Sequence, residues 1–88
     1  MKKEIDIIEY NASKGIQFEW ERGFEISTDL GDNEIIIKAN SEGLISLAKQ
    51  LLTLAQSGVP IGSHIHLDEY NSLENGSIDL IIEKNNIL

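Results

Sequence analysis

The sequence contains no cysteine, a single proline and few basic residues, and it has no long apolar segment. Without cysteine, the fold has neither disulfide bonds nor a thiolate metal site. No stretch approaches the roughly 20 apolar residues that cross a bilayer. Charged residues interrupt the first ten positions at Glu4, Asp6 and Glu9, which is not typical of a signal peptide. We therefore expect a cytoplasmic protein that does not cross a membrane.

Positive charge is scarce, since seven basic residues stand against fifteen acidic ones and the formal net charge is −8. Contacts with nucleic-acid phosphates and with anionic membranes need clustered lysine and arginine, so we expect neither partner. A basic protein partner is favoured, because opposite charges raise the rate of encounter. The alternative is that the acidity serves solubility alone.

Alternating apolar and polar residues predict strands on both sides of one helix. The 88 residues are enough for one domain, residues 1–88. Four alternating segments precede the helix and two follow it: "KEIDI", "IQFEW", "FEIST" and "EIIIKA", then "HIHLD" and "SIDLIIE". We predict a two-layer α+β domain in the order β-β-β-β-α-β-β, with an antiparallel sheet of about six strands and the helix on one face.

The segment from Asn40 to Pro60 predicts the helix. Asn40 or Ser41 can cap its start, and Gly58 before Pro60 predicts a left-handed end. Apolar residues at helical spacing predict the side that covers the sheet: Leu44, Ile45, Leu47, Ala48, Leu51, Leu52, Leu54 and Ala55. Polar residues predict the side that faces water: Ser46, Lys49, Gln50, Thr53 and Gln56. The sheet face without a helix is then open to water.

Acidic side chains gather on this open face of the predicted sheet, among them Glu19, Glu25 and Asp79. The alternation adds a few aliphatic residues to the same face: Ile8, Ile36 and Ile81. Apolar groups with a polar rim are typical of protein-docking surfaces. We therefore predict that this face binds a partner. A homodimer seam and a solvated face without a partner are the alternatives.

The segment "SHIHLDEY" contains both histidines of the chain. Alternate positions of a strand share a face, so His64, His66 and Asp68 could meet at one zinc ion. The spacing is similar to His-x-His-x-Asp-His of the metallo-β-lactamase fold, but Glu69 stands at the last position and the chain is much shorter. The preferred interpretation is that the imidazoles hydrogen-bond across the sheet or to a loop. A metal-binding protein or a small metal-dependent hydrolase is the alternative.

No group of residues predicts catalysis. Ser63 and His64 are neighbours on a strand and point to opposite faces, so they cannot form a nucleophile–base pair. The segment "GVPIG" lacks the Gly-Lys-Ser/Thr of a phosphate-binding loop. We expect a binding protein without a cofactor, not an enzyme.

Two segments, "NSEGLISLAKQLLTLAQSGVP" and "GSHIHLDEYNSLENGSIDLIIEK", resemble immunity protein 32, a family of small bacterial proteins. The resemblance covers residues 40–84. It implies a cytoplasmic immunity protein of a polymorphic toxin system that neutralises a cognate toxin, often a nuclease. It brings no catalytic residue, but it makes the residues of its most recognisable segment candidate contacts: His64, His66, Asp68, Glu69 and Tyr70. An acidic surface would suit a basic nuclease, because carboxylates can occupy a site built for phosphates.

Overall fold

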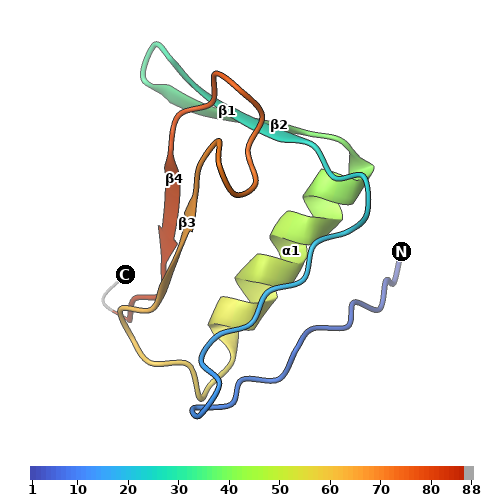
Figure 1. Ribbon diagram of the computed structural model, residues 1–88, viewed down its shortest axis with the longest axis vertical. Coiled ribbons are helices and arrows are strands. Elements are labelled where there is room, and N and C mark those ends of the chain that lie inside the picture. Colours follow the sequence, from blue (N-terminus) through green and yellow to red (C-terminus); the bar gives the residue numbers. More distant parts are fainter. Residues whose placement is uncertain (87–88) are drawn as a thin grey trace.

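The computed structural model describes residues 1–86, with one helix and four short strands. Strand β1 (Ile26–Gly31) pairs antiparallel with β2 (Glu34–Ala39), and β3 (His64–Leu67) pairs antiparallel with β4 (Leu80–Glu83). Helix α1 (Ser41–Ala55) follows β2 directly. In Figure 1 the β1–β2 hairpin crosses the top, β3 and β4 stand on the left, and α1 slants beside them.

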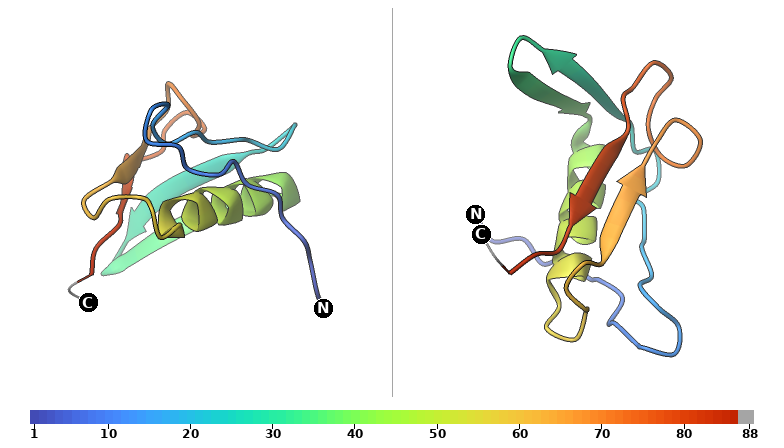
Figure 2. Two further views of the ribbon diagram at one scale, coloured as in Figure 1. Left: turned by 90° about the horizontal axis from the view of Figure 1, so that it is seen from below. Right: turned by 90° about the vertical axis from the view of Figure 1, so that its left-hand side faces the viewer.

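The predicted antiparallel sheet of about six strands is wrong. The chain is α+β with a single helix, but the described residues form two separate two-stranded sheets. The first two predicted strands belong to neither sheet, and an isolated bridge between Asn11 and Gly15 is the regular pairing found before β1. A segment of residues 1–25 therefore runs as extended chain beside the helix, as both views of Figure 2 show.

Polar side chains of the helix take the place of a neighbouring strand for this extended segment. The Gln50 amide donates a hydrogen bond to the Glu19 carbonyl at 2.9 Å. The Ser46 hydroxyl accepts one from the Glu21 N–H at 2.8 Å. Buried backbone groups need a partner, and a side chain can supply it as well as a strand. The segment is thus held against α1 without a ladder.

The end of α1 is fixed by two long side chains. Gln56 accepts a hydrogen bond from the Tyr10 N–H at 2.7 Å and donates one to the Ile8 carbonyl at 3.2 Å. The Lys84 ammonium donates to the carbonyls of Gln56 and Val59, at 2.7 and 2.8 Å. The last turn of the helix has no basic residue of its own. Lys84 therefore supplies the positive charge that a helix C-terminus favours.

The predicted division of the helix into a dry and a wet side is wrong in part. Ser46 and Gln50 are fully buried and Thr53 is almost so, although all three were expected to face water. Three leucines of the predicted apolar stripe are about half exposed instead: Leu44, Leu51 and Leu52. The extended segment covers the polar side, and two short sheets are too small to cover the whole stripe.

The core lies between α1 and the inner sides of the two sheets. It contains six clustered buried residues: Ile26, Leu47, Leu54, Ile65, Leu67 and Leu73. Aromatic residues of the extended segment close it from one side, with the rings of Trp20 and Phe24 stacked at 4.7 Å between centroids. This burial of apolar surface is the main favourable term for a chain of this size.

The predicted cap of the helix is confirmed at Asn40. Its Oδ1 accepts hydrogen bonds from the N–H groups of Gly43 and Glu25, at 2.8 and 3.0 Å. Its Nδ2 donates to the Gly23 carbonyl at 2.9 Å. The predicted left-handed end at Gly58 is wrong, because no positive φ occurs there. The chain leaves the helix through extended backbone at the residue after Ala55.

The first turn of α1 approaches the backbone just before β1 so closely that there is no room for a side chain at Gly43. A Cβ at this position would lie 2.4 Å from the Glu25 carbonyl oxygen. We expect Gly43→Ala to lower the free energy of unfolding by about 1–3 kcal/mol, despite the better helix propensity of alanine. Urea denaturation measures the change.

Gly58→Ala is the matched control for this variant. It has no positive φ, and its Cβ would meet the Tyr10 ring at 3.4 Å, which is an ordinary contact. Its free energy of unfolding should therefore change little or rise slightly. Equal losses in the two variants would contradict the close approach at Gly43.

Candidate protein-binding surface

The outer side of β3 and β4 is polar and exposed. The register places His64 opposite Glu83 and His66 opposite Ile81, and all four side chains are exposed. The intervening residues of β3 turn into the core. The predicted alternation of "HIHL" is therefore confirmed, and it sets both imidazoles on the outside.

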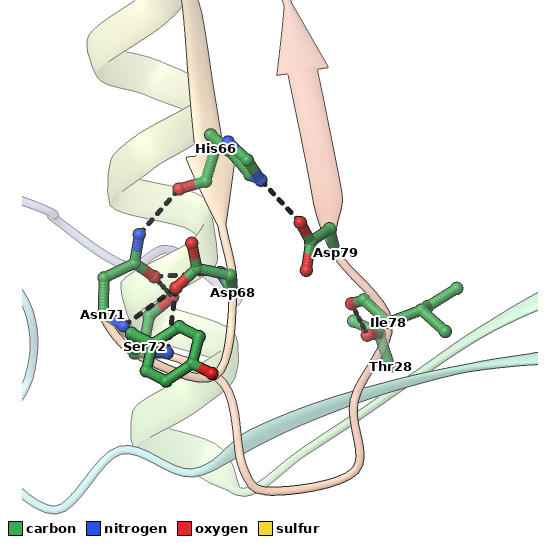
Figure 3. Close-up of polar contacts among 8 residues, drawn as sticks. Thr28, His66, Asp68, Asn71, Ser72, Ile78 and Asp79 are labelled. Carbon is green, nitrogen blue, oxygen red and sulfur yellow. Dashed lines mark hydrogen bonds and ion pairs between the residues drawn. The ribbon is translucent and has the colours of Figure 1, made fainter.

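His66 contacts Asp79 across the hairpin, as Figure 3 shows. The Nε2 atom of His66 lies 2.9 Å from a carboxylate oxygen of Asp79, and the two side chains are 45% and 61% exposed. Nδ1 of His64 lies 3.4 Å from the Gly62 carbonyl oxygen. These contacts agree with the preferred interpretation of the histidines as hydrogen-bonding residues.

The three residues of the metal hypothesis do not converge. His66 turns to Asp79, His64 turns to the preceding loop, and the Asp68 carboxylate accepts hydrogen bonds from the following backbone. Within residues 1–86, no three histidine, aspartate or glutamate side chains are placed to share a metal ion. A zinc site needs three or four donors aimed at one point. This geometry gives the metal-binding alternative no support.

Asp68 organises the turn that follows β3. Its carboxylate accepts hydrogen bonds from the N–H groups of Tyr70 and Asn71, at 2.8 and 3.1 Å. Its carbonyl accepts one from the N–H of Leu73 at 2.8 Å, and Leu73 is buried in the core. An aspartate that binds the backbone two and three residues later is typical of a tight, well-defined turn. Residues 68–73 are therefore anchored at both ends.

Asn71 closes the same turn against β3. Its Oδ1 accepts hydrogen bonds from the Asp68 N–H at 3.0 Å and from the Ser72 hydroxyl at 2.6 Å. Its Nδ2 donates to the His66 carbonyl at 2.8 Å (Figure 3). Asn71 was not among the residues predicted from the sequence as partner contacts. The signal was an aspartate and an asparagine three residues apart after a strand, both of which favour turns bonded to their own backbone.

Tyr70 projects from this turn with 94% of its surface exposed. The adjacent Glu69 carboxylate accepts a hydrogen bond from the Gly76 N–H at 2.6 Å, which ties the turn to the next one. The backbone at Tyr70 is thus held in place while its ring is free. Aromatic side chains with few rotatable bonds are frequent centres of protein interfaces.

We call this region the β3–β4 surface. It comprises the outer side of the hairpin and the turn after β3: His64, His66, Asp68, Glu69, Tyr70, Asp79, Ile81 and Glu83. Six of the eight residues predicted from the sequence as partner contacts lie on it.

The other two predicted contacts, Glu19 and Glu25, lie elsewhere, on the segment before β1. A carboxylate oxygen of Glu19 is 3.6 Å from the Lys49 ammonium, and Glu21 is closer at 3.2 Å. The hydrogen bond with Glu21, helped by the charge of Glu19, raises the pKa of Lys49 above its ordinary value. Glu25 is exposed near the start of α1. Both were placed with Asp79 by a sheet that does not form.

The described residues thus make a small α+β domain, with an ordered acidic surface and an exposed aromatic side chain. The chain belongs to a family described as immunity protein 32, whose model matches residues 34–85. This confirms the resemblance found in the sequence, and the match includes the whole β3–β4 surface. No curated protein and no solved structure matches the chain. Across residues 1–86, no helix has the length and apolar character needed to span a membrane.

We expect Asn71→Ala to lower the free energy of unfolding by about 1 kcal/mol, because the variant leaves three backbone and side-chain groups without their partner. The exchange of the Tyr70 amide hydrogen should also become faster, which amide hydrogen exchange measures directly. Asn86→Ala, at an exposed position beyond β4, is the control and should change neither quantity. Unchanged exchange in Asn71→Ala would contradict the proposed rigidity of the turn.

Proposed function

We propose that the protein is a non-enzymatic immunity protein of the bacterial cytoplasm, which binds a cognate toxin one to one and blocks it. The observation that carries the proposal is the family match over residues 34–85. The matched part includes the complete β3–β4 surface and excludes Glu19 and Glu25. We therefore place the toxin contact on the β3–β4 surface and give the two other glutamates a role in long-range attraction only.

Tyr70 is the centre of the proposed contact. It offers a large exposed ring on a turn that is already ordered, so little conformational freedom is lost on binding. Asp68 and Glu69 precede it in the same turn, and Asp79 adds negative charge elsewhere on the β3–β4 surface. Such charges raise the rate of association and select a partner of opposite charge. The Tyr70 ring, once it is buried by the toxin, would supply most of the affinity.

A basic toxin fits this surface, and a nuclease is the class we propose. The chain carries a net charge of −8, which attracts a basic partner over long distances. Nucleases hold phosphates with clustered positive side chains. Carboxylates of the β3–β4 surface would occupy such a site and exclude the nucleic acid. Inhibition would then be stoichiometric, without chemistry on the toxin.

Titration calorimetry with the toxin domain encoded beside this gene tests the proposal. We expect tight one-to-one binding with loss of toxicity, and Tyr70→Ala should weaken the affinity by about 30-fold or more. Tyr70→Phe keeps the ring and should bind nearly as well. Ile61→Ala removes an exposed apolar side chain outside the β3–β4 surface and serves as the control. Normal affinity of Tyr70→Ala would remove the turn from the interface.

The charged part of the contact is tested separately with Glu25→Lys combined with Asp79→Lys. Association with the toxin should slow at low salt, and the difference from the unchanged protein should shrink at high salt. The thermal midpoint should change little, because both side chains are exposed. Glu19 is less suitable for this test, because its partner Lys49 is only 14% exposed, whereas His66, the partner that Asp79→Lys loses, is 45% exposed. Equal association rates at low salt would contradict the electrostatic part of the proposal.

A further inference from the structure

Strand β2 has one open edge. Within residues 1–86 its only strand partner is β1. The far edge of β1 is covered, because the N–H groups of Glu74 and Ile78 donate to the carbonyls of Ile26 and Thr28. The hairpin is thus closed by the chain on the β1 side and open on the β2 side. An open, apolar edge strand is a template for pairing, and a lone two-stranded ribbon is only marginally stable.

The hairpin also exposes apolar side chains that belong to its core-facing side. The register pairs Thr28 with Ile37 and Leu30 with Ile35, so these residues share the side on which Ile26 is buried. Ile35, Ile37 and Leu30 are nevertheless 68%, 43% and 63% exposed. The core-facing side of the hairpin therefore extends beyond the core, and its apolar side chains near the tip are exposed to solvent. Together these residues leave on the order of 300 Å² of apolar surface, which is within the range of the largest apolar patch on a typical monomer, and such patches are often functional.

The sequence of β2 is complementary to itself in antiparallel orientation. In "EIIIK", residues 34–38, a pairing centred on Ile36 sets Glu34 opposite Lys38 of a second copy. It also sets Ile35 opposite Ile37, and the twofold symmetry makes each of these two contacts twice. In the part of the chain that the structure describes, neither Glu34 nor Lys38 takes part in an ion pair. Both side chains are exposed and available.

We propose that the protein forms a homodimer through antiparallel pairing of β2 with β2 of a second copy, centred on Ile36. The product is a four-stranded sheet in the order β1-β2-β2-β1. The positions of the charges favour a second copy over another protein as the partner. When two β2 strands pair antiparallel, the negative Glu34 of each copy lies opposite the positive Lys38 of the other. This proposal does not rest on the function proposed above.

The same pairing would also cover an exposed apolar part of α1. Opposite residues of an antiparallel pair point to the same face, so both apolar hairpin sides face the same way. The tip of one hairpin then reaches the Ala39 end of β2 in the second copy, from which α1 begins. Leu44, in the first turns of that helix, is 57% exposed. One partner would thus cover the hairpin tip and the start of α1 together.

The proposed interface is separate from the β3–β4 surface. Residues 74–78 lie along β1, and β1 lies between them and β2. The open edge of β2 is therefore the edge that faces away from the turns at residues 68–76. Substitutions in β2 can test the dimer without touching Tyr70 or its supporting hydrogen bonds.

Sedimentation equilibrium of the full chain, over a roughly hundredfold range of concentration, tests the dimer. We expect a reversible monomer–dimer equilibrium. Lys38→Glu sets glutamate opposite Glu34 twice and should weaken dimerisation at least about tenfold. Lys14→Glu makes the same change of net charge in an exposed loop and should dimerise normally.

The complementary charges allow two rescue experiments. The double exchange Glu34→Lys with Lys38→Glu restores opposite charges at both positions and should restore the dimer. Glu34→Lys and Lys38→Glu should each be weakened alone, and an equimolar mixture should form the mixed dimer. A protein that stays monomeric at every concentration would overturn the proposal. A dimer that neither single variant weakens would overturn it as well, because its contact would lie on another surface.

Discussion

The side chain of Asn40 joins three parts of the chain at the start of α1. Its amide caps the helix, holds the backbone at Glu25 and binds the carbonyl of Gly23. The close approach of Gly43 to the Glu25 carbonyl depends on the same junction. Together they fix the direction in which the β1–β2 hairpin leaves the core. The exposed apolar tip of the hairpin is a consequence of that direction, because the helix turns away from β2 after one short connection.

Much of the chain from β1 onward follows from local sequence. The span of β2, the cap at Asn40 and the inward side of β3 were predicted correctly, since each depends on a few neighbouring residues. The sheet was not, because its first two strands were inferred from alternation alone. Alternation shows which side of an extended segment is apolar, but not what pairs with its backbone. Here Ser46 and Gln50, read as the wet side of the helix, provide that partner. A polar side chain is buried readily when it binds a backbone group.

In the candidate surface, too, features that depend on neighbouring residues could be predicted from the sequence, whereas contacts between distant segments could not. The outward position of His64 and His66 could be predicted from the alternation within one short segment, and the family resemblance from two segments between residues 40 and 84. The contact of His66 with Asp79 depends on the register of β3 and β4, which no short pattern specifies. Glu19 was grouped with Asp79 only through the absent sheet. The exposure of Tyr70 and the role of Asn71 arise from a network of turn hydrogen bonds that becomes visible once the backbone is placed.

The stacking of Trp20 on Phe24 gives the protein an intrinsic optical reporter for one region. Trp20 is the single tryptophan of the chain, and it lies on the extended segment that side chains of α1 hold in place. That attachment is incomplete, because the Oε1 atom of Gln50 is buried without a hydrogen-bond partner in the described part of the chain. Segments held without a ladder open at lower free energy than the core. Tryptophan fluorescence would therefore follow the detachment of this segment, whereas circular dichroism would follow the melting of α1.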